Sequence, residues 1–354
     1  MKAAIELGVF EILAKAGASG RKSLTAKEIA EQLVRPVANG AVVNQGYLQR
    51  VLRLLASVNV LSESVEVVAA ELGNLTSSDT YHRRSYALTQ VGKHFVRGED
   101  EVSLAPLMLI TEDWVFKKTW DHLSAAILDD SVDPFVRAHG TSHFQLNKED
   151  PRVGKAFNTA MASHSRLYTQ AVLGAYQGFQ DVNCLVDVGG GLGSSLALIT
   201  AKYPHIRGIN FDLPLVVAAA PPYPGVEHVG GDMFESVPSG DAIFMKWVLH
   251  DWSDEDCLTI LRNCLKALPA SGGKVIVVDT VLPESISLES ENAGARSFVG
   301  LRTDVAMLAY NSGGAKERTL HEFQQLADAV GFASMELVVT VDFMSALEFT
   351  KTAA

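Results

Sequence analysis

Apolar residues in the first part of the chain recur every three to four positions, a spacing that places them on one face of an α-helix. Residues 3–15 and 47–61 both follow it. Residues 24–33 begin near Thr25 and carry Glu28 three positions later, the arrangement of a capping box at the start of a helix. The pattern therefore predicts three helices within the first hundred residues.

A second pattern, an alternation with a period of two, follows at residues 85–92 and predicts a small wing of β-structure. Helix, helix and wing together resemble a winged-helix unit, so DNA binding has to be weighed. Residues 1–100 hold 12 Lys and Arg against 10 Asp and Glu, a net charge of +2, whereas a DNA-reading domain shows a clear basic face. We expect this region to pack against a second subunit instead.

Residues 101–180 show helical periodicity throughout and are rich in Met, Phe, Trp and His. From residue 183 the pattern changes to short β-rich stretches that alternate with helices, which predicts a parallel α/β sheet. The last two stretches, 335–342 and 345–351, lie too close together for a crossover helix, so we expect an antiparallel hairpin at one edge of the sheet.

The length of 354 residues favours two domains, which we place at 1–100 and 101–354. The second divides into a helical segment, 101–180, and a sheet core, 181–354.

The composition excludes several classes of partner. With 41 acidic and 30 basic residues, the formal charge of −11 repels phosphate backbones and anionic lipid. No stretch approaches the roughly 18 apolar residues that span a bilayer. Glu6 and Glu11 interrupt the apolar run that a signal peptide would need. The three cysteines lack the spacing of a zinc site or a disulfide framework. We predict a cytoplasmic protein that binds neither nucleic acid nor membrane.

A glycine-rich turn follows the first strand of the predicted sheet. Gly189, Gly191 and Gly193 alternate between that strand and a helix that begins near Ser194. Glycines in such a turn let a ligand approach the backbone closely. Ser194 stands where the third glycine of a dinucleotide-binding motif would fall, so no pyrophosphate is implied.

Carboxylates follow the next two strands. Asp212 comes 21 residues after Gly191, where α/β nucleotide sites place an acid that accepts hydrogen bonds from the ribose hydroxyls. Asp232 and Met233 follow the third strand and suit an adenine, by a hydrogen bond and by apolar contact. Because parallel strands end at one edge of a sheet, these residues predict a nucleoside site there.

The fourth strand carries a cation and an imidazole. Lys246 lies in an otherwise apolar stretch, where a buried charge is costly unless it pairs or its head reaches water. We favour a position facing the cofactor cleft over one at the rim of the sheet. His250 follows at the carboxyl end of the strand, and this place at the ligand edge favours a general base over a structural histidine.

The chain as a whole resembles the plant caffeic acid O-methyltransferase family. The resemblance rests on LVDVGGGLG, YPHIRGINFDLP, YPGVEHVGGDMF, FMKWVLHDWSDEDC and GGAKERT, together with KAAIELGVFEILAKAG at the start. It covers nearly the entire chain. The implied fold is α/β: a Rossmann-like S-adenosylmethionine methyltransferase sheet preceded by a helical, winged-helix-like dimerisation domain. Relatives usually carry a further segment before KAAIELG, so a longer native N-terminus is expected.

The resemblance implies a homodimeric, metal-independent enzyme that takes its methyl group from S-adenosyl-L-methionine and releases S-adenosyl-L-homocysteine. The implied cofactor contacts are Gly189, Asp212, Asp232, Met233 and Lys246. His250 is the implied catalytic base, flanked by Asp279 and Glu317. The caffeate enzymes carry Glu at the first of these two acidic positions, so Asp279 is a conservative departure.

The phenolic pocket implied by the resemblance contains several Met and aromatic side chains, which suit a flat ring. It is lined by Phe157, Met161, His164, Trp247, Met307 and Asn311. Asn147 stands where the family has a His, and His143 where it has a small residue, so the ring substituents stay open. Caffeate, 5-hydroxyferulate or their aldehydes are the expected substrates, with a flavonoid, a stilbene, an alkaloid phenol or a side-chain amine as alternatives.

The chemistry agrees with these roles. A phenol has a pKa of about 10, so a base has to take its proton at neutral pH, and imidazole suits this task. A carboxylate beside the ring would orient it and stabilise the imidazolium. The terminal hairpin and the glycine spacing disfavour a nicotinamide-dependent oxidoreductase. The presence of the base and both acids disfavours a non-enzymatic winged-helix regulator.

Overall fold

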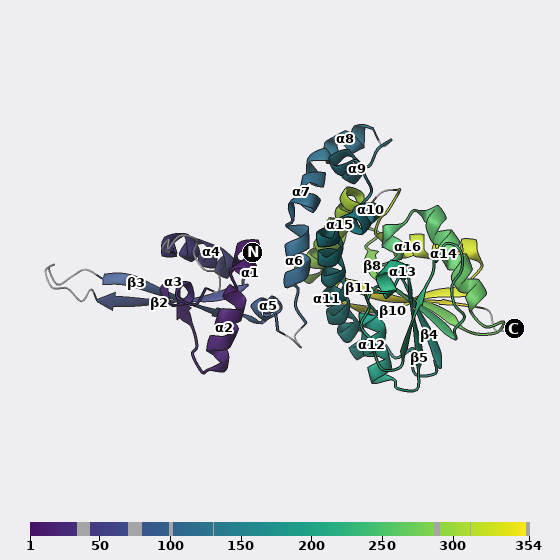
Figure 1. Cartoon of the computed structure of the whole chain (residues 1–354), viewed down its shortest axis with the longest axis horizontal. Helices are drawn as coiled ribbons and strands as arrows, with labels where there is room; N and C mark the ends of the chain where they lie inside the picture. The colour runs from purple at the N-terminus through teal and green to yellow at the C-terminus, as the bar shows by residue number, and fades with distance from the viewer. Residues whose placement is uncertain are drawn as a thin grey trace. The chain divides into compact units, whose positions relative to one another are not determined.

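The computed structural model describes residues 1–33, 43–69, 80–98, 102–129, 131–286, 291–311 and 313–351. The chain divides into two compact units, Met1–Glu112 and Asp113–Ala354. Figure 1 colours the first from purple to blue and the second from blue through green to yellow.

The first unit combines short helices with a small sheet. Its helices are α1 (Lys2–Glu6), α2 (Val9–Ala18), α3 (Ala26–Ala30), α4 (Gln45–Ser57), α5 (Gln90–Lys93) and α6 (Ala105–Thr111). Its strands β1 (Leu24–Thr25), β2 (Leu61–Ala69) and β3 (Thr80–Leu88) are antiparallel, in the order β1-β3-β2. The capping box predicted for Thr25 and Glu28 is present at the start of α3. Buried apolar side chains of the helices and the sheet form one core.

The helices predicted in this unit differ from the observed ones in extent. The single helix expected at 3–15 is two helices, because Gly8 between them adopts a left-handed φ of 74°. Helix α4 ends at Ser57, four residues before the predicted end, and Leu61 begins a strand that the sequence did not predict.

The predicted wing at 85–92 is also displaced. Strand β3 ends at Leu88, because the Thr89 side chain accepts a hydrogen bond from the Gly92 amide and thereby starts α5. Strand β3 forms an antiparallel hairpin with β2, so the observed β-structure lies mostly before the predicted wing in the sequence. The winged-helix assignment itself stays a prediction.

The second unit is built on a mixed sheet. Its strands are β4 (Cys184–Val188), β5 (Arg207–Asp212), β6 (Val226–Gly230), β7 (Ala242–Lys246), β8 (Lys274–Leu282), β9 (Arg318–Thr319), β10 (Ser334–Val341) and β11 (Met344–Thr350). They follow the order β10-β11-β8-β7-β4-β5-β6, and β9 pairs with β8. Strands β4 to β8 are parallel, whereas β11 is antiparallel to both β8 and β10. The predicted Rossmann-like sheet with a terminal antiparallel hairpin is confirmed.

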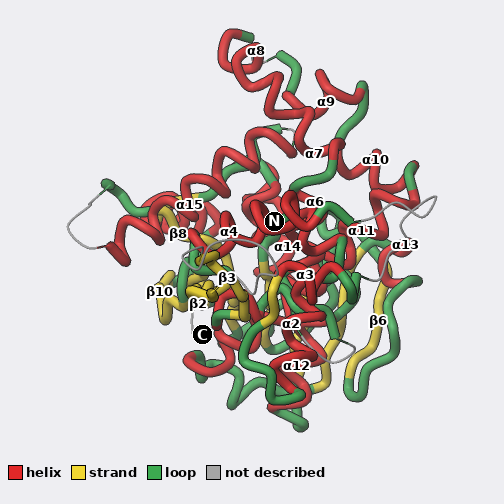
Figure 2. Tube along the Cα trace, turned by 90° about the vertical axis from the view of Figure 1, so that its left-hand side faces the viewer, coloured by secondary structure: helices red, strands yellow, loops and turns green. Residues whose placement is uncertain are grey.

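Helices cover both faces of this sheet. The helices of this unit are α7 (Trp114–Thr119), η2 (Trp120–His122), α8 (Leu123–Leu128), α9 (Pro134–His139), α10 (His143–Glu149), α11 (Pro151–Ala175), α12 (Ser194–Lys202), α13 (Pro214–Val217), η3 (Leu249–Asp251), α14 (Asp254–Ala267), α15 (Glu291–Tyr310) and α16 (Leu320–Val330). Helices α11 and α12 pack on one face and α14 and α16 on the other, as Figure 1 shows. Figure 2 shows α7, α8 and α9 grouped at one end.

The core therefore has two layers. Strand side chains point alternately to the two faces, so Leu185 belongs to one apolar cluster with Leu196 of α12, and Val186 to another with Leu261 of α14. Within the described part of the chain, no helix is both long and apolar enough to cross a membrane.

Strand β4 lies between β5 and β7, so the direction in which strands are added reverses beside it. In open parallel sheets a ligand binds beyond the carboxyl ends of the strands at such a switch point. All the predicted cofactor contacts, together with Trp247 and His250, lie at or just after the ends of β4, β5, β6 and β7.

Candidate active site

The glycine turn after β4 depends on backbone conformations that favour glycine. Gly189, Gly191 and Gly193 have φ values of 68°, 57° and 80°, and Gly193 caps α12. Gly190, which the sequence did not single out, is required for another reason. A Cβ atom there would lie 2.2 Å from Oδ1 of the buried Asn210. By contrast, a Cβ atom at Gly191 would meet no described atom within 4 Å, so the turn leaves open space on that side.

Asp212 joins the end of β5 to this turn. Its Oδ2 accepts a hydrogen bond of 2.8 Å from the Gly191 amide, and its Oδ1 accepts one of 2.7 Å from the Leu213 amide. Burial raises the pKa of Asp212, while these two amides oppose the rise. The structure thus brings two of the predicted cofactor elements into direct contact.

A second acid near the turn was not singled out from the sequence. Asp187 in β4 is buried, and its Oδ2 has no hydrogen-bond partner among the described residues. Burial, and next the charge of Asp212, raise the pKa of Asp187 to about 8. Its position in the strand that leads into the glycine turn was the only sequence signal.

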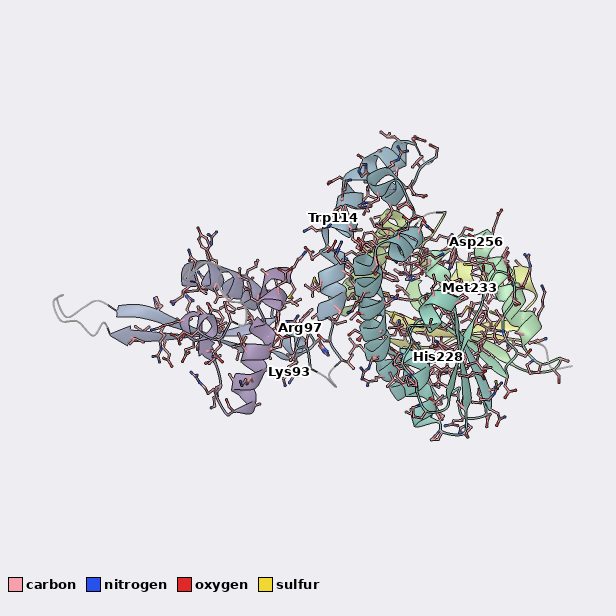
Figure 3. The ribbon with its side chains drawn as sticks, viewed as in Figure 1. Lys93, Arg97, Trp114, His228, Met233 and Asp256 are labelled. Atoms are coloured by element: carbon pink, nitrogen blue, oxygen red, sulfur yellow. The ribbon has the colours of Figure 1, made fainter. Side chains whose placement is uncertain are left out.

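Asp232 and Met233 lie just beyond β6, whose last residue, Gly230, pairs with Asp212 of β5. Oδ1 of Asp232 accepts a hydrogen bond from the Phe234 amide, which stabilises the turn. The carbonyl of Met233 accepts one from the Asn263 side chain. Figure 3 labels Met233 at this edge of the sheet.

Lys246 is the last residue of β7 and is buried. Its Nζ lies 3.1 Å from Nδ1 of His164 and 4.9 Å from the ring centroid of Trp247. Burial lowers the pKa of Lys246 to about 8, and the charges of Asp279 and Asp187 oppose this fall. The lysine head therefore lies inside the molecule, among acids and aromatic rings, and not at a solvated rim.

His250 in η3 is held from both sides of its ring. Its Nδ1 lies 2.9 Å from Oε1 of the buried Glu317, and its Nε2 lies 3.5 Å from Oδ1 of Asp251. Burial raises the pKa of Glu317 well above its ordinary value. When the Glu317 carboxylate accepts a hydrogen bond from Nδ1–H, the lone pair of the neutral imidazole lies on Nε2, which can then take a proton.

Asp279 in β8 is fully buried, and both its oxygens lack a hydrogen-bond partner among the described residues. Burial raises the pKa of Asp279 to about 7, and the charge of His250 is the largest opposing effect. The two flanking acids thus differ. Glu317 contacts the imidazole directly, whereas Asp279 acts on it through its charge.

Arg318 connects the segment that carries Glu317 to the segment that carries His250. Its guanidinium donates to the carbonyls of Leu249 and Trp252, at 2.7 and 2.8 Å, and to Oδ1 of Asp254. The Lys316 amide also donates to the His250 carbonyl at 3.0 Å. This buried arginine was not singled out from the sequence, because its partners lie more than sixty positions away.

The residues predicted to line the phenolic pocket come from α11, from the end of β7 and from α15 with the residue after it. Phe157, Met161 and His164 share one face of α11 by their spacing. The rings of His164 and Trp247 stack, and Trp247 lies 5.2 Å from the ring of His250. These contacts place His164 and Trp247 beside His250.

Met307 and Asn311 lie on or next to α15. The Asn311 amide donates to Asp251 and also contacts Sδ of Met307. His143 connects Phe157 to Asn311: its ring lies 4.7 Å from the ring of Phe157, and its Nδ1 lies 3.1 Å from Oδ1 of Asn311. Among the described residues, no group of three or more His, Cys, Asp or Glu is arranged to hold a metal ion.

Together, the switch-point turn, the acids at successive strand ends and the buried imidazole define a class of protein: an S-adenosylmethionine-dependent methyltransferase. Residues 120–333 match an O-methyltransferase domain, and residues 1–98 match an O-methyltransferase dimerisation domain. The chain belongs to the O-methyltransferase family.

Curated relatives match almost the whole chain. Desmethyl-yatein O-methyltransferase of Sinopodophyllum hexandrum is 46% identical, covering 99% of this chain and 93% of the relative. Caffeic acid 3-O-methyltransferase of Clarkia breweri is also 46% identical, covering 100% and 90%. Tricetin 3',4',5'-O-trimethyltransferase of Triticum aestivum is 45% identical, covering 99% and 92%.

Solved structures agree with the fold. A methyltransferase of calicheamicin biosynthesis, with S-adenosylhomocysteine bound, is 27% identical with a TM-score of 0.77, covering 99% of this chain and 93% of that chain. Human N-acetylserotonin methyltransferase in complex with S-adenosylmethionine has the same TM-score and coverage at 20% identity, which shows the fold alone. The protein is an S-adenosylmethionine-dependent O-methyltransferase, so the oxidoreductase and the regulator are set aside.

Proposed function

We propose that this enzyme methylates a phenolic hydroxyl of a phenylpropanoid, namely caffeate, 5-hydroxyferulate or a corresponding aldehyde, with His250 as general base. The observation that carries the proposal is the 2.9 Å contact between Nδ1 of His250 and Oε1 of Glu317, which leaves Nε2 as the proton acceptor. Similarity to caffeic acid 3-O-methyltransferases supports the substrate class.

In this proposal the side chains near His250 have distinct tasks. Glu317 holds the imidazole and balances the positive charge that forms when Nε2 takes the phenolic proton. The buried carboxylate of Asp279 adds negative potential on the same ring. Phe157, Met161, His164, Trp247, Met307 and Asn311 orient the phenol so that its oxygen faces the methyl donor.

S-adenosylmethionine supplies an activated methyl group as a sulfonium cation. Gly189, Asp212, Asp232, Met233 and Lys246 are the residues proposed to hold it. The open space beside Gly191 and the unpartnered Oδ2 of Asp187 fit a bound ligand at this edge. The methyl transfer is proposed to need no metal.

The division of tasks along the chain belongs to the same proposal. Residues 1–100 mediate formation of a homodimer, and residues 101–354 carry catalysis, with 101–180 contributing to the substrate pocket. The family match of residues 1–98 supports the first part. A cytoplasmic location is also proposed.

A flavonoid is the second candidate substrate, because tricetin and flavone O-methyltransferases are about as similar to this chain as the caffeate enzymes are. Phenolic hydroxyls of stilbenes and alkaloids would be methylated by the same reaction.

The test is transfer of labelled methyl from S-adenosylmethionine to caffeate, 5-hydroxyferulate, their aldehydes and catechol flavonoids, with a chelator present. We expect transfer to persist with the chelator and to fall by about 10²-fold or more in His250→Ala. His321→Ala, at an exposed histidine of α16, is the matched control. Wild-type inactivity on every phenol, or full activity of His250→Ala, would refute the proposal.

A further inference from the structure

A chain of four polar side chains leads away from the imidazole of His250. Nδ2 of Asn147 lies 3.1 Å from Nε2 of His143, and Nδ1 of His143 lies 3.1 Å from Oδ1 of Asn311. The Asn311 amide in turn donates to Oδ1 of Asp251 at 2.5 Å. That oxygen of Asp251 is the one 3.5 Å from Nε2 of His250.

The donors and acceptors of these four side chains allow only one direction for the hydrogen bonds between them. An ionised Asp251 can only accept, so Asn311 presents its amide to it and its carbonyl oxygen to His143. That carbonyl needs a donor, which places a proton on Nδ1 of His143. Nε2 of His143 is then an acceptor and accepts a hydrogen bond from the Asn147 amide. Every donor in the chain points toward Asp251.

The surroundings of His143 keep its ring neutral, as this direction requires. The side chain is buried, and the rings of Phe116, Phe135 and Phe157 lie 5.2, 5.5 and 4.7 Å from it. Burial lowers the pKa of His143 to about 4. A neutral imidazole with one donor and one acceptor is the only form that satisfies both amide neighbours.

Given the proposed role of His250 as base, on which this inference rests, we infer that His143 is a positioning residue for that base. It aligns the Asn311 amide so that Asp251 stays an ionised acceptor beside Nε2 of His250. The negative charge of Asp251 then stabilises the imidazolium that forms as the phenolic proton is taken.

The charges around the base come from several elements. Asp251 interacts with the charges of His250 in η3, Asp279 in β8 and Glu317 next to β9. Burial raises the pKa of Asp251 to about 6, while His250 and the Asn311 hydrogen bond oppose the rise. Loss of the Asn311 donor therefore makes Asp251 a weaker acid, which stays protonated to higher pH.

The test compares kcat across pH for variants that keep or remove the donor to Asn311. His143→Phe retains a ring among the phenylalanines but removes both hydrogen bonds. His143→Asn keeps an amide N–H close to the position of Nδ1. Gln145→Ala, on the exposed side of the same helix, is the control for a change in α10.

In His143→Phe we expect kcat relative to wild type to rise with pH. Without the Nδ1 donor the Asn311 amide is no longer held toward Asp251, and loss of the charge-assisted hydrogen bond from Asn311 weakens this acid about tenfold. Asp251, about half ionised at pH 6 in the wild type, would then be about one tenth ionised at pH 6 and about nine tenths at pH 8. The deficit is therefore about fivefold at pH 6 and less than about twofold at pH 8. His143→Asn and Gln145→Ala should follow the wild-type profile.

A deficit of the same size at every pH in His143→Phe, or the same profile in His143→Asn, would overturn the inference, because a packing defect does not follow the ionisation of Asp251. Asn311→Leu removes the donor directly, has to give the same pH dependence, and carries the test if His143→Phe does not fold. If His250→Ala retains activity, the proposed function is wrong. If His250→Ala is inactive but the ratio of the His143→Phe kcat to the wild-type kcat does not change with pH, only this inference is wrong.

Discussion

The imidazole of His164 stacks on the indole of Trp247, with ring centroids 3.7 Å apart and an angle of 17° between the rings. Trp247 reaches this place with a φ of 54°, a conformation that bulky residues rarely adopt. Lys246, directly before it, lies against Nδ1 of the same imidazole. The end of β7 thus places a strained aromatic residue and a buried cation against one histidine of α11.

Replacing His164 separates its two contributions to stability. His164→Phe keeps a ring on Trp247 but removes the acceptor facing Lys246, so we expect a loss of about 1–2 kcal/mol. His164→Ala also leaves a cavity and should lose about 3–4 kcal/mol. Urea denaturation of both variants measures the difference. Equal losses would mean that the stack contributes nothing beyond the hydrogen bond.

Glu317→Gln tests the charge next to the base without changing the shape of the side chain. In the proposed mechanism the amide oxygen still accepts a hydrogen bond from Nδ1 of His250, but the negative charge that balances the imidazolium is lost. We expect kcat to fall by roughly 10²-fold with KM changed less than about threefold, since the effect arises in the transition state. Glu235→Gln, at an exposed acid, is the control in steady-state kinetics. If kcat is unchanged in Glu317→Gln, Glu317 does not contribute to proton transfer.

Asp279 makes stability depend on pH. Burial raises its pKa to about 7, from an ordinary value near 4. Between these values the folded protein retains a proton that the unfolded chain has released, so this group's contribution to stability falls as pH rises from about 4 to about 7. Asp279→Asn lacks this titration and should gain about 1–3 kcal/mol on the wild type between pH 4.5 and pH 8. Denaturant unfolding at both pH values checks it; a pH-independent difference would contradict it.

Two neighbouring glycines should respond differently to the same substitution. Gly190→Ala drives a methyl group against Asn210 and Asp187, which are buried in the sheet, so it should lower stability by about 1–3 kcal/mol. Gly191→Ala meets no atom of the chain and costs only the strain of its φ of 57°, about 1–2 kcal/mol.

In Gly191→Ala the new methyl group projects into the proposed cofactor space. We therefore expect affinity for S-adenosylmethionine to fall more than about tenfold while the protein stays folded. Calorimetric titration and thermal unfolding of both variants separate the two effects. If Gly191→Ala binds S-adenosylmethionine with wild-type affinity, the cofactor does not bind beside this turn.

The sequence predicted the sheet well because its evidence is local: a short apolar strand, a helix and a polar residue at each strand end recur along the chain. It missed the break at Gly8 because apolar spacing continues across that residue, and only its left-handed φ separates the helices. Strand β2 was missed because the apolar repeat of the preceding helix continues as far as Leu61.

The sequence singled out residues of the candidate site where they lie in recognisable motifs. His250, Asp279 and Glu317 lie in conspicuous stretches, but which acid contacts the imidazole depends on packing between distant segments. Glu317 is bonded to the ring and Asp279 is not. The need for glycine at 190 arises from Asn210, a residue on another strand, and has no local pattern.

Strand β11 lies between β8 and β10, and its Ser345 pairs with Asp279. Strand β11 is the last of the described strands in the sequence, yet it lies inside the sheet and not at its edge. During synthesis the ribosome therefore releases β4 to β8, together with the glycine turn and His250, before the neighbour of β8 exists. Until then β8 presents an open edge to other nascent chains. Completion of the sheet therefore waits for β11, which pairs with the edge of β8 that carries Asp279.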